Sequence, residues 1–229
     1  MTTPPAALPR RPRNWLLIAT HLAAWVPLGR VLLSTFGNPN AVNPIQDLTF
    51  GTGLPALIFL LLSLAVTPAN TLFGWRWALP LRKWLGLYAF FYATAHLLIF
   101  VGLDYGFDVG LLSEAIFEKR YALVGLAAFL ILLPLALTST RGWQQRLGKV
   151  WKQLHRLVYL AAALAVVHFV WLVKADIREP LTYGAVLGLL LLARLPAVRR
   201  RLARLRSPSG RAPQATSGAP PGVPSDPAS

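Results

Sequence analysis

The stretch Leu147–Lys174, LGKVWKQLHRLVYLAAALAVVHFVWLVK, begins basic and amphipathic and then becomes a long apolar run. It contains two histidines, His155 and His168, which lie thirteen positions apart. An ionisable side chain inside an apolar membrane span is costly, so such a residue indicates a functional site by default. Two imidazoles on one membrane helix, one near each leaflet, suggest metal or haem ligands stacked across a bilayer.

The composition is that of an integral membrane protein. The chain has 229 residues, of which 55% are hydrophobic and only 14% are charged, and its mean hydropathy is +0.51. Soluble domains are closer to about 45–50% apolar and about 25% charged. Several apolar runs approach the ~20 residues that an α-helix needs to cross the ~30 Å hydrocarbon core of a bilayer. The absence of cysteine excludes disulfides, thiolate ligands and cysteine-bound iron–sulfur clusters.

The apolar runs predict an all-α membrane protein, a bundle of six transmembrane helices. Pro68 is expected to end the second helix, and Pro134 lies near the end of the fourth, where it is a candidate kink. A short interfacial helix is a candidate in the acidic loop 104–120, whereas the basic segment 138–149 is expected to be a loop. The predicted spans cover residues 15–33, 54–67, 84–103, 121–137, 150–173 and 181–195.

The two ends of the chain differ in composition from the spans. Residues 1–14 are Pro-rich and basic. Residues 197–229 are first basic and then rich in Pro, Ser, Gly and Ala. Both segments are therefore expected to be disordered, and residues 15–196 are expected to form the transmembrane domain.

The distribution of Lys and Arg predicts which side of the membrane each loop occupies. One side has both termini, the segment between the second and third spans and the segment between the fourth and fifth spans, and it holds 18 of the 23 basic residues. The other side holds seven of the eight acids. Because short cytoplasmic loops carry an excess of Lys and Arg, both termini are expected to be cytoplasmic. The net charge of +15 is expected to face anionic membrane lipid, and no nucleic-acid partner is expected.

The depth of each histidine follows from the rise of about 1.5 Å per residue along its predicted helix. His96 lies about 18 Å into the third span and His168 about 27 Å into the fifth, so both are expected in the outer half of the membrane. His155 and His21 are expected in the inner half. Arg82, fourteen positions before His96, shares a helix face with it and lies at the inner edge of the third span.

A pair of axial imidazoles requires two histidines from different helices at one depth, and His96 with His168 fits this requirement best. His155 adjoins two basic residues and is either a ligand or an interfacial residue. His21 is an inner ligand, a quinone contact or a packing residue. Arg82 is either a charge that sets the topology or a contact for a haem propionate.

The predicted spans contain no acid. This disfavours proton relays, cation transporters and metal pairs that need carboxylate ligands. Haem b held by histidine alone is the cofactor that these residues favour. The alternative is a transporter or scaffold in which the histidines pack or bind substrate.

Six short motifs lie in and between the spans. They are HLA at 21–23, RKWLGL at 82–87, ATAH at 93–96, LTST at 137–140, LGKVWKQLHRLVYL at 147–160 and HFVWLVK at 168–174. Together they resemble the MsrQ (YedZ) family, a branch of the ferric-reductase-like transmembrane domains. The resemblance covers about residues 14–200, and its most specific part lies in the fifth span.

The resemblance implies a haem-binding membrane subunit in the bacterial inner membrane. Such a subunit passes electrons from the quinol pool to a periplasmic molybdopterin-containing catalytic subunit, which reduces methionine sulfoxide in oxidised proteins. No substrate catalysis is then expected on this chain. The resemblance also implies FMN binding. An alternative that keeps the haem is electron delivery to another acceptor, such as ferric iron.

In the wider superfamily, the third and fifth core helices each carry two histidines, and these four residues ligate two stacked haems. His96, His155 and His168 occupy three of the four positions, and Arg82 stands where the inner histidine of the third helix would be. The resemblance therefore implies an outer haem held by His96 and His168, and one or two haems in total. The sixth ligand of an inner haem is His21 or a group other than histidine.

Overall fold

The computed structural model describes residues 14–37, 42–173, 176–196 and 198, and within them only helices and turns are found. Of the segments expected to be disordered, all but Asn14 and Val198 lie outside the described residues. The α-helices are α1 (Asn14–Phe36), α2 (Pro44–Phe73), α3 (Leu81–Ile99), α4 (Val109–Glu118), α5 (Arg120–Leu137), α6 (Arg141–Leu147), α7 (Lys149–Leu154), α8 (Val158–Leu172) and α9 (Arg178–Leu192). Two 3-10 turns, η1 (Arg76–Ala78) and η3 (His155–Leu157), and a π-helical turn, η2 (Phe100–Asp104), lie between them.

The described helices have the length and surface of membrane spans. Five of them are long and apolar enough to cross a bilayer, namely Trp15–Phe36, Pro44–Phe73, Leu81–Asp104, Arg120–Leu137 and Lys149–Leu172. Large apolar side chains such as Leu33, Leu98 and Leu130 are exposed on their outer faces, where lipid rather than water would cover them. The prediction of an all-α membrane protein is confirmed.

The predicted sixth span corresponds to α9. This helix has 15 residues, so it rises only about 22 Å. A bilayer core is about 30 Å thick, and α9 is therefore not among the five long apolar helices of the described chain. The count of six spans stays a prediction.

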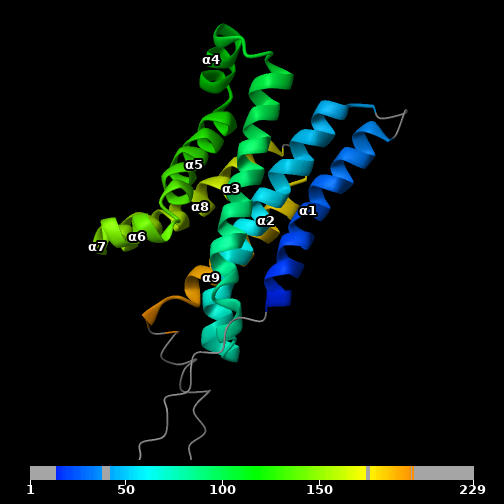
Figure 1. The fold of residues 1–229 in the computed structure, drawn as a ribbon. Coiled ribbons are helices and arrows are strands. Elements are labelled where there is room, and N and C mark those ends of the chain that lie inside the picture. The colour runs from blue at the N-terminus through cyan, green and yellow to red at the C-terminus, as the bar shows by residue number, and fades with distance from the viewer. Residues whose placement is uncertain (1–13, 38–41, 174–175, 197, 199–229) are drawn as a thin grey trace, which may run out of the picture.

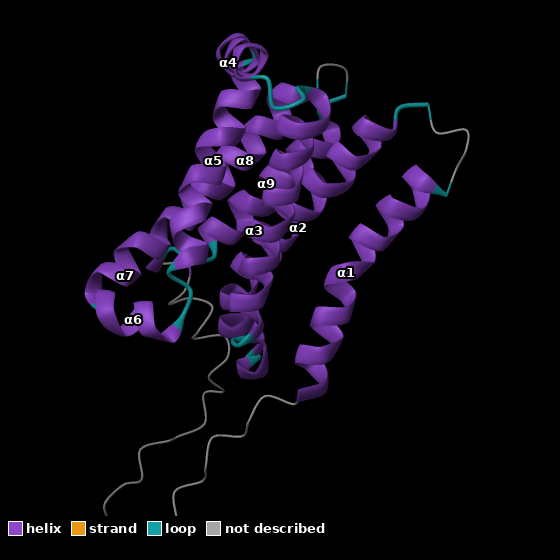
Figure 2. Ribbon diagram, turned by 45° about the horizontal axis from the view of Figure 1, so that its top comes forward, coloured by secondary structure: helices purple, strands orange, loops and turns teal. Residues whose placement is uncertain are grey.

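Two helical pairs form the centre of the bundle. α2 packs along α3 and α5 packs along α8, while contacts between α3 and α5 and between α2 and α8 join the pairs. α1 lies against α2 (Figure 1), and α9 lies against α8 and α2 (Figure 2). The short α4 is at one end of the bundle, and the first turn of α1 is at the other (Figure 1). The buried core is apolar and is built around Leu57, Leu60, Leu64, Ala89, Tyr92, Leu132, Ala161, Ala162, Val166 and Leu187.

A proline in α1 is accommodated by a tyrosine from α3. Pro27 lies inside α1, and a proline within a helix removes a backbone donor and disturbs the turn before it. The hydroxyl of the fully buried Tyr92 accepts a hydrogen bond from Leu28 N–H at 3.1 Å and donates one to the carbonyl of Ala24 at 2.7 Å. Tyr92 therefore ties α1 to α3 at the proline.

The second helix is much longer than predicted. It begins after Asn43, whose side chain accepts from Gln46 N–H, and ends at Gly74, which adopts the left-handed conformation. The expectation that Pro68 ends this helix was wrong. Pro68 has no N–H for the carbonyl of Leu64, and the guanidinium of Arg194 donates to that carbonyl instead, at 2.6 Å. The tertiary contact supplies the bond that the proline removes.

The second half of the chain differs from the prediction at two places. The segment 138–149, expected to be a loop, contains the helix α6, whose N-cap residue is Thr140. The fifth span, expected to be one helix, is interrupted by the 3-10 turn η3 at His155. A 3-10 turn has about 3.0 residues instead of about 3.6, so η3 changes the angle of His155 relative to His168. The expected short helix in the acidic loop is present as α4, with Asp108 as its N-cap.

Candidate metal centre

His96, in the last turn of α3, and His168, near the end of α8, face each other between the two helices. Their ring centroids are 6.1 Å apart and the ring planes are inclined by 81°. A metal–imidazole bond is about 2 Å long and a ring nitrogen lies about 1 Å from its ring centre, so one metal ion between two facing imidazoles separates their centroids by about 6 Å. The spacing of the two rings therefore fits a shared axial metal.

Hydrogen bonds determine which nitrogen of each ring is available. Nδ1 of His96 lies 2.9 Å from the carbonyl oxygen of Thr49 on α2, and Nδ1 of His168 lies 2.7 Å from that of Tyr121 on α5. A carbonyl oxygen only accepts, so each Nδ1 carries the hydrogen and donates it. In a neutral imidazole the lone pair is then on Nε2. No hydrogen bond to either Nε2 is found within the described residues, so both lone pairs are free to bind a metal.

Each of these rings lies directly on the backbone of the neighbouring helix. A Cβ atom at Gly53 would come within 3.0 Å of Nδ1 and Cε1 of His96. A Cβ atom at Gly125 would come within 2.7 Å of Nδ1 and 2.8 Å of Cε1 of His168. The two glycines thus make the space that the imidazoles occupy.

His155 is placed at the start of η3, away from a second histidine. Its Nδ1 donates to the carbonyl of Trp151 at 3.1 Å, and its ring stacks on the Trp151 indole with centroids 3.9 Å apart. Its Nε2 is buried and has no hydrogen-bond partner among the residues that the structure describes. A buried polar atom without a partner is costly, and an axial metal bond to Nε2 would remove this cost. The residues present therefore fit a haem at His155 as well.

Within the described residues, the side-chain hydrogen bond and the ring contacts of His21 are with aromatic side chains of α3. Its Nδ1 is 2.8 Å from the hydroxyl of Tyr88, and its ring meets Trp84 edge-on with centroids 4.7 Å apart. The structure thus brings His96 and His168 together, and it leaves His21 and His155 in separate aromatic surroundings. The role of His21 stays a prediction.

Two arginines lie at the end of the bundle where α1 begins and α9 ends. The Arg82 side chain is exposed, and its backbone carbonyl accepts from the Ser63 hydroxyl at 2.9 Å. Arg194 is half-buried and donates to the Tyr159 hydroxyl and to the Leu64 carbonyl, both at 2.6 Å. Neither arginine pairs with an acid in the described part of the chain.

Several residues of this region were not found from the sequence. The sequence pattern did not single out Arg194 from the other basic residues, although a basic residue after the last helix and a proline inside an earlier one could have suggested the contact. Gly53 and Gly125 gave no signal, because a single glycine in an apolar helix is common.

Within the described residues, no three side chains of the His, Cys, Asp or Glu type lie together as ligands for a metal ion. A macrocycle held by two histidines therefore fits these residues better than an ion held by protein side chains alone.

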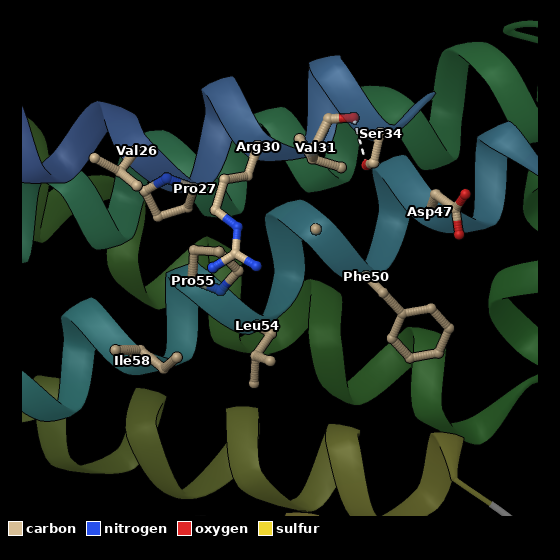
Figure 3. A pocket seen from close by; sticks show the side chains of 11 residues that line it. Val26, Pro27, Arg30, Val31, Ser34, Asp47, Phe50, Leu54, Pro55 and Ile58 are labelled. Carbon is tan, nitrogen blue, oxygen red and sulfur yellow. Dashed lines mark hydrogen bonds between the residues drawn. The ribbon is translucent and has the colours of Figure 1, made fainter. Parts of the chain in front are cut away.

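An open pocket of about 600 Å³ lies between α1 and α2 (Figure 3). Its walls are mainly apolar. The guanidinium of Arg30 reaches from α1 toward Pro55 on α2, and Asp47 lies in the first turn of α2. Gly51, Leu54 and Ile58 on α2 line the pocket, whereas Thr49 and Gly53 touch His96. At about 100° per residue these two sets lie on opposite faces of α2. The pocket and His96 are therefore separated by one helix.

Comparison with known proteins places these features in a family. Residues 52–166 match the family described as ferric reductase like transmembrane component. A protein of Rhodospirillum rubrum named protein-methionine-sulfoxide reductase heme-binding subunit MsrQ is 50% identical over 86% of this chain and 92% of its own length. Proteins of the same name are 42% identical in Herminiimonas arsenicoxydans, over 76% of this chain and 81% of the relative, and 47% identical in Xanthomonas oryzae, over 76% and 79%. No solved structure matches the chain.

Proposed function

Because this chain belongs to the MsrQ family of haem-binding subunits, within the ferric-reductase-like transmembrane proteins, we propose that it is a haem b electron-transfer subunit of a methionine-sulfoxide reductase system. Electrons pass from the quinol pool to a periplasmic molybdopterin-containing catalytic subunit, and methionine sulfoxide is reduced on that partner. The single observation that supports this most strongly is the His96–His168 pair, with ring centroids 6.1 Å apart.

The residues of the chain hold and orient the cofactor. His96 and His168 would hold the haem through Nε2, and the carbonyls of Thr49 and Tyr121 hold the ring hydrogens at Nδ1. When bound, haem supplies a one-electron carrier in the low-dielectric part of the bundle. His155 offers a further buried Nε2 for an inner haem, with His21 as its proposed sixth ligand or as a quinone contact and Arg82 as a contact for a haem propionate. One or two haems are thus expected.

The pocket between α1 and α2 is a second proposed place for the quinol, apart from His21, which does not line it. It is mostly apolar, as a site for a membrane-dissolved ring must be, and it contains the charged groups Arg30 and Asp47. Quinol oxidation would release two protons and two electrons, and both protons would leave through the open side of the pocket, which the exposed Asp47 lines. One helix of about 10 Å diameter separates the pocket from His96.

The proposed orientation puts both termini in the cytoplasm and uses six spans in the bacterial inner membrane. The excess of Lys and Arg on one side supports it. Labelling of single cysteines, introduced one at a time at each loop in this cysteine-free chain, tests the orientation.

FMN is a second cofactor that the family resemblance predicts, and equilibrium dialysis of the purified protein against FMN tests it.

A redox-titrated absorption spectrum with haem quantification tests the proposal. The purified protein should show a Soret band and a reducible α band, and His96→Ala or His168→Ala should each abolish the low-spin signal. Gln144→Ala, an exposed change on α6, is the matched control and should leave the spectrum intact. A colourless protein from haem-replete cells would instead support a transporter or scaffold. A haem protein that reduces ferric iron and does not co-purify with a molybdoenzyme would support the other reductase role.

A further inference from the structure

The two histidines that face each other are surrounded in the same way. The carbonyl that accepts from Nδ1 lies 47 residues before the histidine in both cases, at Thr49 for His96 and at Tyr121 for His168. The glycine that contacts the ring lies 43 residues before it in both cases, at Gly53 and Gly125. The whole set is therefore repeated with an offset of 72 residues, once in the α2–α3 pair and once in the α5–α8 pair.

The position of the glycine follows from helix geometry. A carbonyl oxygen has two lone pairs, and the helix uses one of them for the N–H four residues later. Side chains in a helix point back toward the N-terminus, so the residue at i+4 covers the turn that contains the carbonyl of residue i. Glycine at i+4 leaves the second lone pair most open to a ring that lies flat against the helix, because it has no side chain over that carbonyl. Gly53 stands four residues after Thr49, and Gly125 four residues after Tyr121.

We propose that Gly53 and Gly125 are positioning residues for the two axial histidines. Each glycine lets an imidazole lie on the neighbouring helix, where Nδ1–H bonds to the exposed carbonyl and Nε2 is left without a hydrogen bond among the described residues. The hydrogen bond to the carbonyl also makes Nε2 a stronger donor to a metal. This inference rests on the proposed haem ligation by His96 and His168.

Alanine substitution tests the proposal because the added Cβ meets the ring. Gly125→Ala and Gly53→Ala should weaken or split the low-spin electron paramagnetic resonance signal and raise the midpoint potential of the haem. The effect should be larger for Gly125→Ala, whose Cβ would come to 2.7 Å, than for Gly53→Ala at 3.0 Å. Gly29→Ala and Gly188→Ala are the controls, because a Cβ there meets nothing within 4 Å. Glycine variants whose signal and potential match those of the controls would overturn the proposal.

A double-mutant cycle on thermal unfolding provides a second readout, besides the spectrum and potential of the haem. Gly125→Ala should lower the temperature of thermal unfolding in the parent chain and should have a smaller effect in the His168→Ala background, because the ring that it contacts is gone. Gly188→Ala should have the same small effect in both backgrounds. If Gly125→Ala alone does not fold, the double variant should recover folded protein. Failure of the double variant to fold would show that contact with His168 is not the cause, and would overturn the proposal.

The two proposals fail in different ways. A parent protein without haem, or one whose low-spin signal survives His96→Ala and His168→Ala, would reject the haem function. A parent protein whose signal depends on both histidines, but not on Gly53 or Gly125, would reject only the positioning role. The experiments therefore distinguish the ligands from the residues that hold them.

Discussion

Removal of one hydroxyl, by Tyr92→Phe, should loosen the contact between α1 and α3. The side chain of Tyr92 is fully buried, and its hydroxyl serves both Leu28 N–H and the Ala24 carbonyl beside Pro27. Phenylalanine keeps the ring contacts with Phe59 and Phe91 but leaves these two backbone groups without the hydroxyl. The variant therefore isolates the hydrogen bonds from the packing.

The expected magnitude comes from two hydrogen bonds. A neutral hydrogen bond contributes about 0.5–1.5 kcal/mol net, while hydrogen bonds between membrane helices average about 0.6 kcal/mol. Two of them give about 1–2 kcal/mol. Since 1 kcal/mol moves the unfolding temperature of a chain of this length by about 2–4 °C, the expected decrease is about 2–8 °C.

Thermal unfolding in detergent, followed by circular dichroism, measures this decrease. Tyr121→Phe is the matched control, because it makes the same chemical change at a partly buried tyrosine whose hydroxyl has no hydrogen bond in the described structure. It keeps the ring and loses no hydrogen bond, so it should shift the unfolding temperature by less than about 2 °C. Equal shifts for Tyr92→Phe and Tyr121→Phe would refute the reasoning. Such a result would mean that α1 closes its own helical bond at Pro27 without help.

Three other side chains give further expected outcomes. Arg194→Met should lower the free energy of unfolding by about 1–3 kcal/mol because the Leu64 carbonyl loses its donor; the effect should shrink in a Pro68→Ala background, which thermal unfolding can check. Arg30→Gln should slow haem reduction by a soluble quinol in stopped-flow measurements without changing haem content, and an unchanged rate would remove the α1–α2 pocket from the quinol site. Tyr105 accepts from Lys119 Nζ at 2.7 Å, which raises the pKa of this lysine above its ordinary value of 10.5. A raised pKa stabilises the folded state below about pH 10.5 and loses this effect as the pH rises through the folded value, so the unfolding temperature should fall less steeply in alkali for Lys119→Met than for the parent.

Hydropathy and histidine spacing gave the membrane class and the candidate ligands without any structure. The run from Leu147 to Lys174 predicts a membrane helix because its apolar residues are long enough to cross a bilayer. His96 and His168 were paired from their depths alone, since a fixed rise per residue converts sequence position into depth. The structure places their rings 6.1 Å apart, as this pairing requires.

Helix ends were predicted less well, because they depend on contacts that sequence periodicity does not contain. Pro68 is a helix terminator in isolation, yet α2 continues through it because Arg194, 126 positions later, donates to the carbonyl that the proline leaves free. The 3-10 turn at His155 contains no proline or glycine that would have predicted it from the sequence. Such features depend on contacts with neighbouring helices, and residue propensity and hydrophobic periodicity along the sequence therefore do not predict them.

The sequence by itself determined that this protein lies in a membrane and that histidines at two depths are its candidate ligands, because burying apolar runs and ionisable groups in lipid has a large and local free-energy cost. Only the tertiary structure decided which nitrogen each ring presents and how closely the rings approach. Those properties depend on the carbonyls of Thr49 and Tyr121 and on the missing side chains of Gly53 and Gly125. They arise between helices that are far apart in sequence, and directional hydrogen bonds and steric contact act only once those helices have packed.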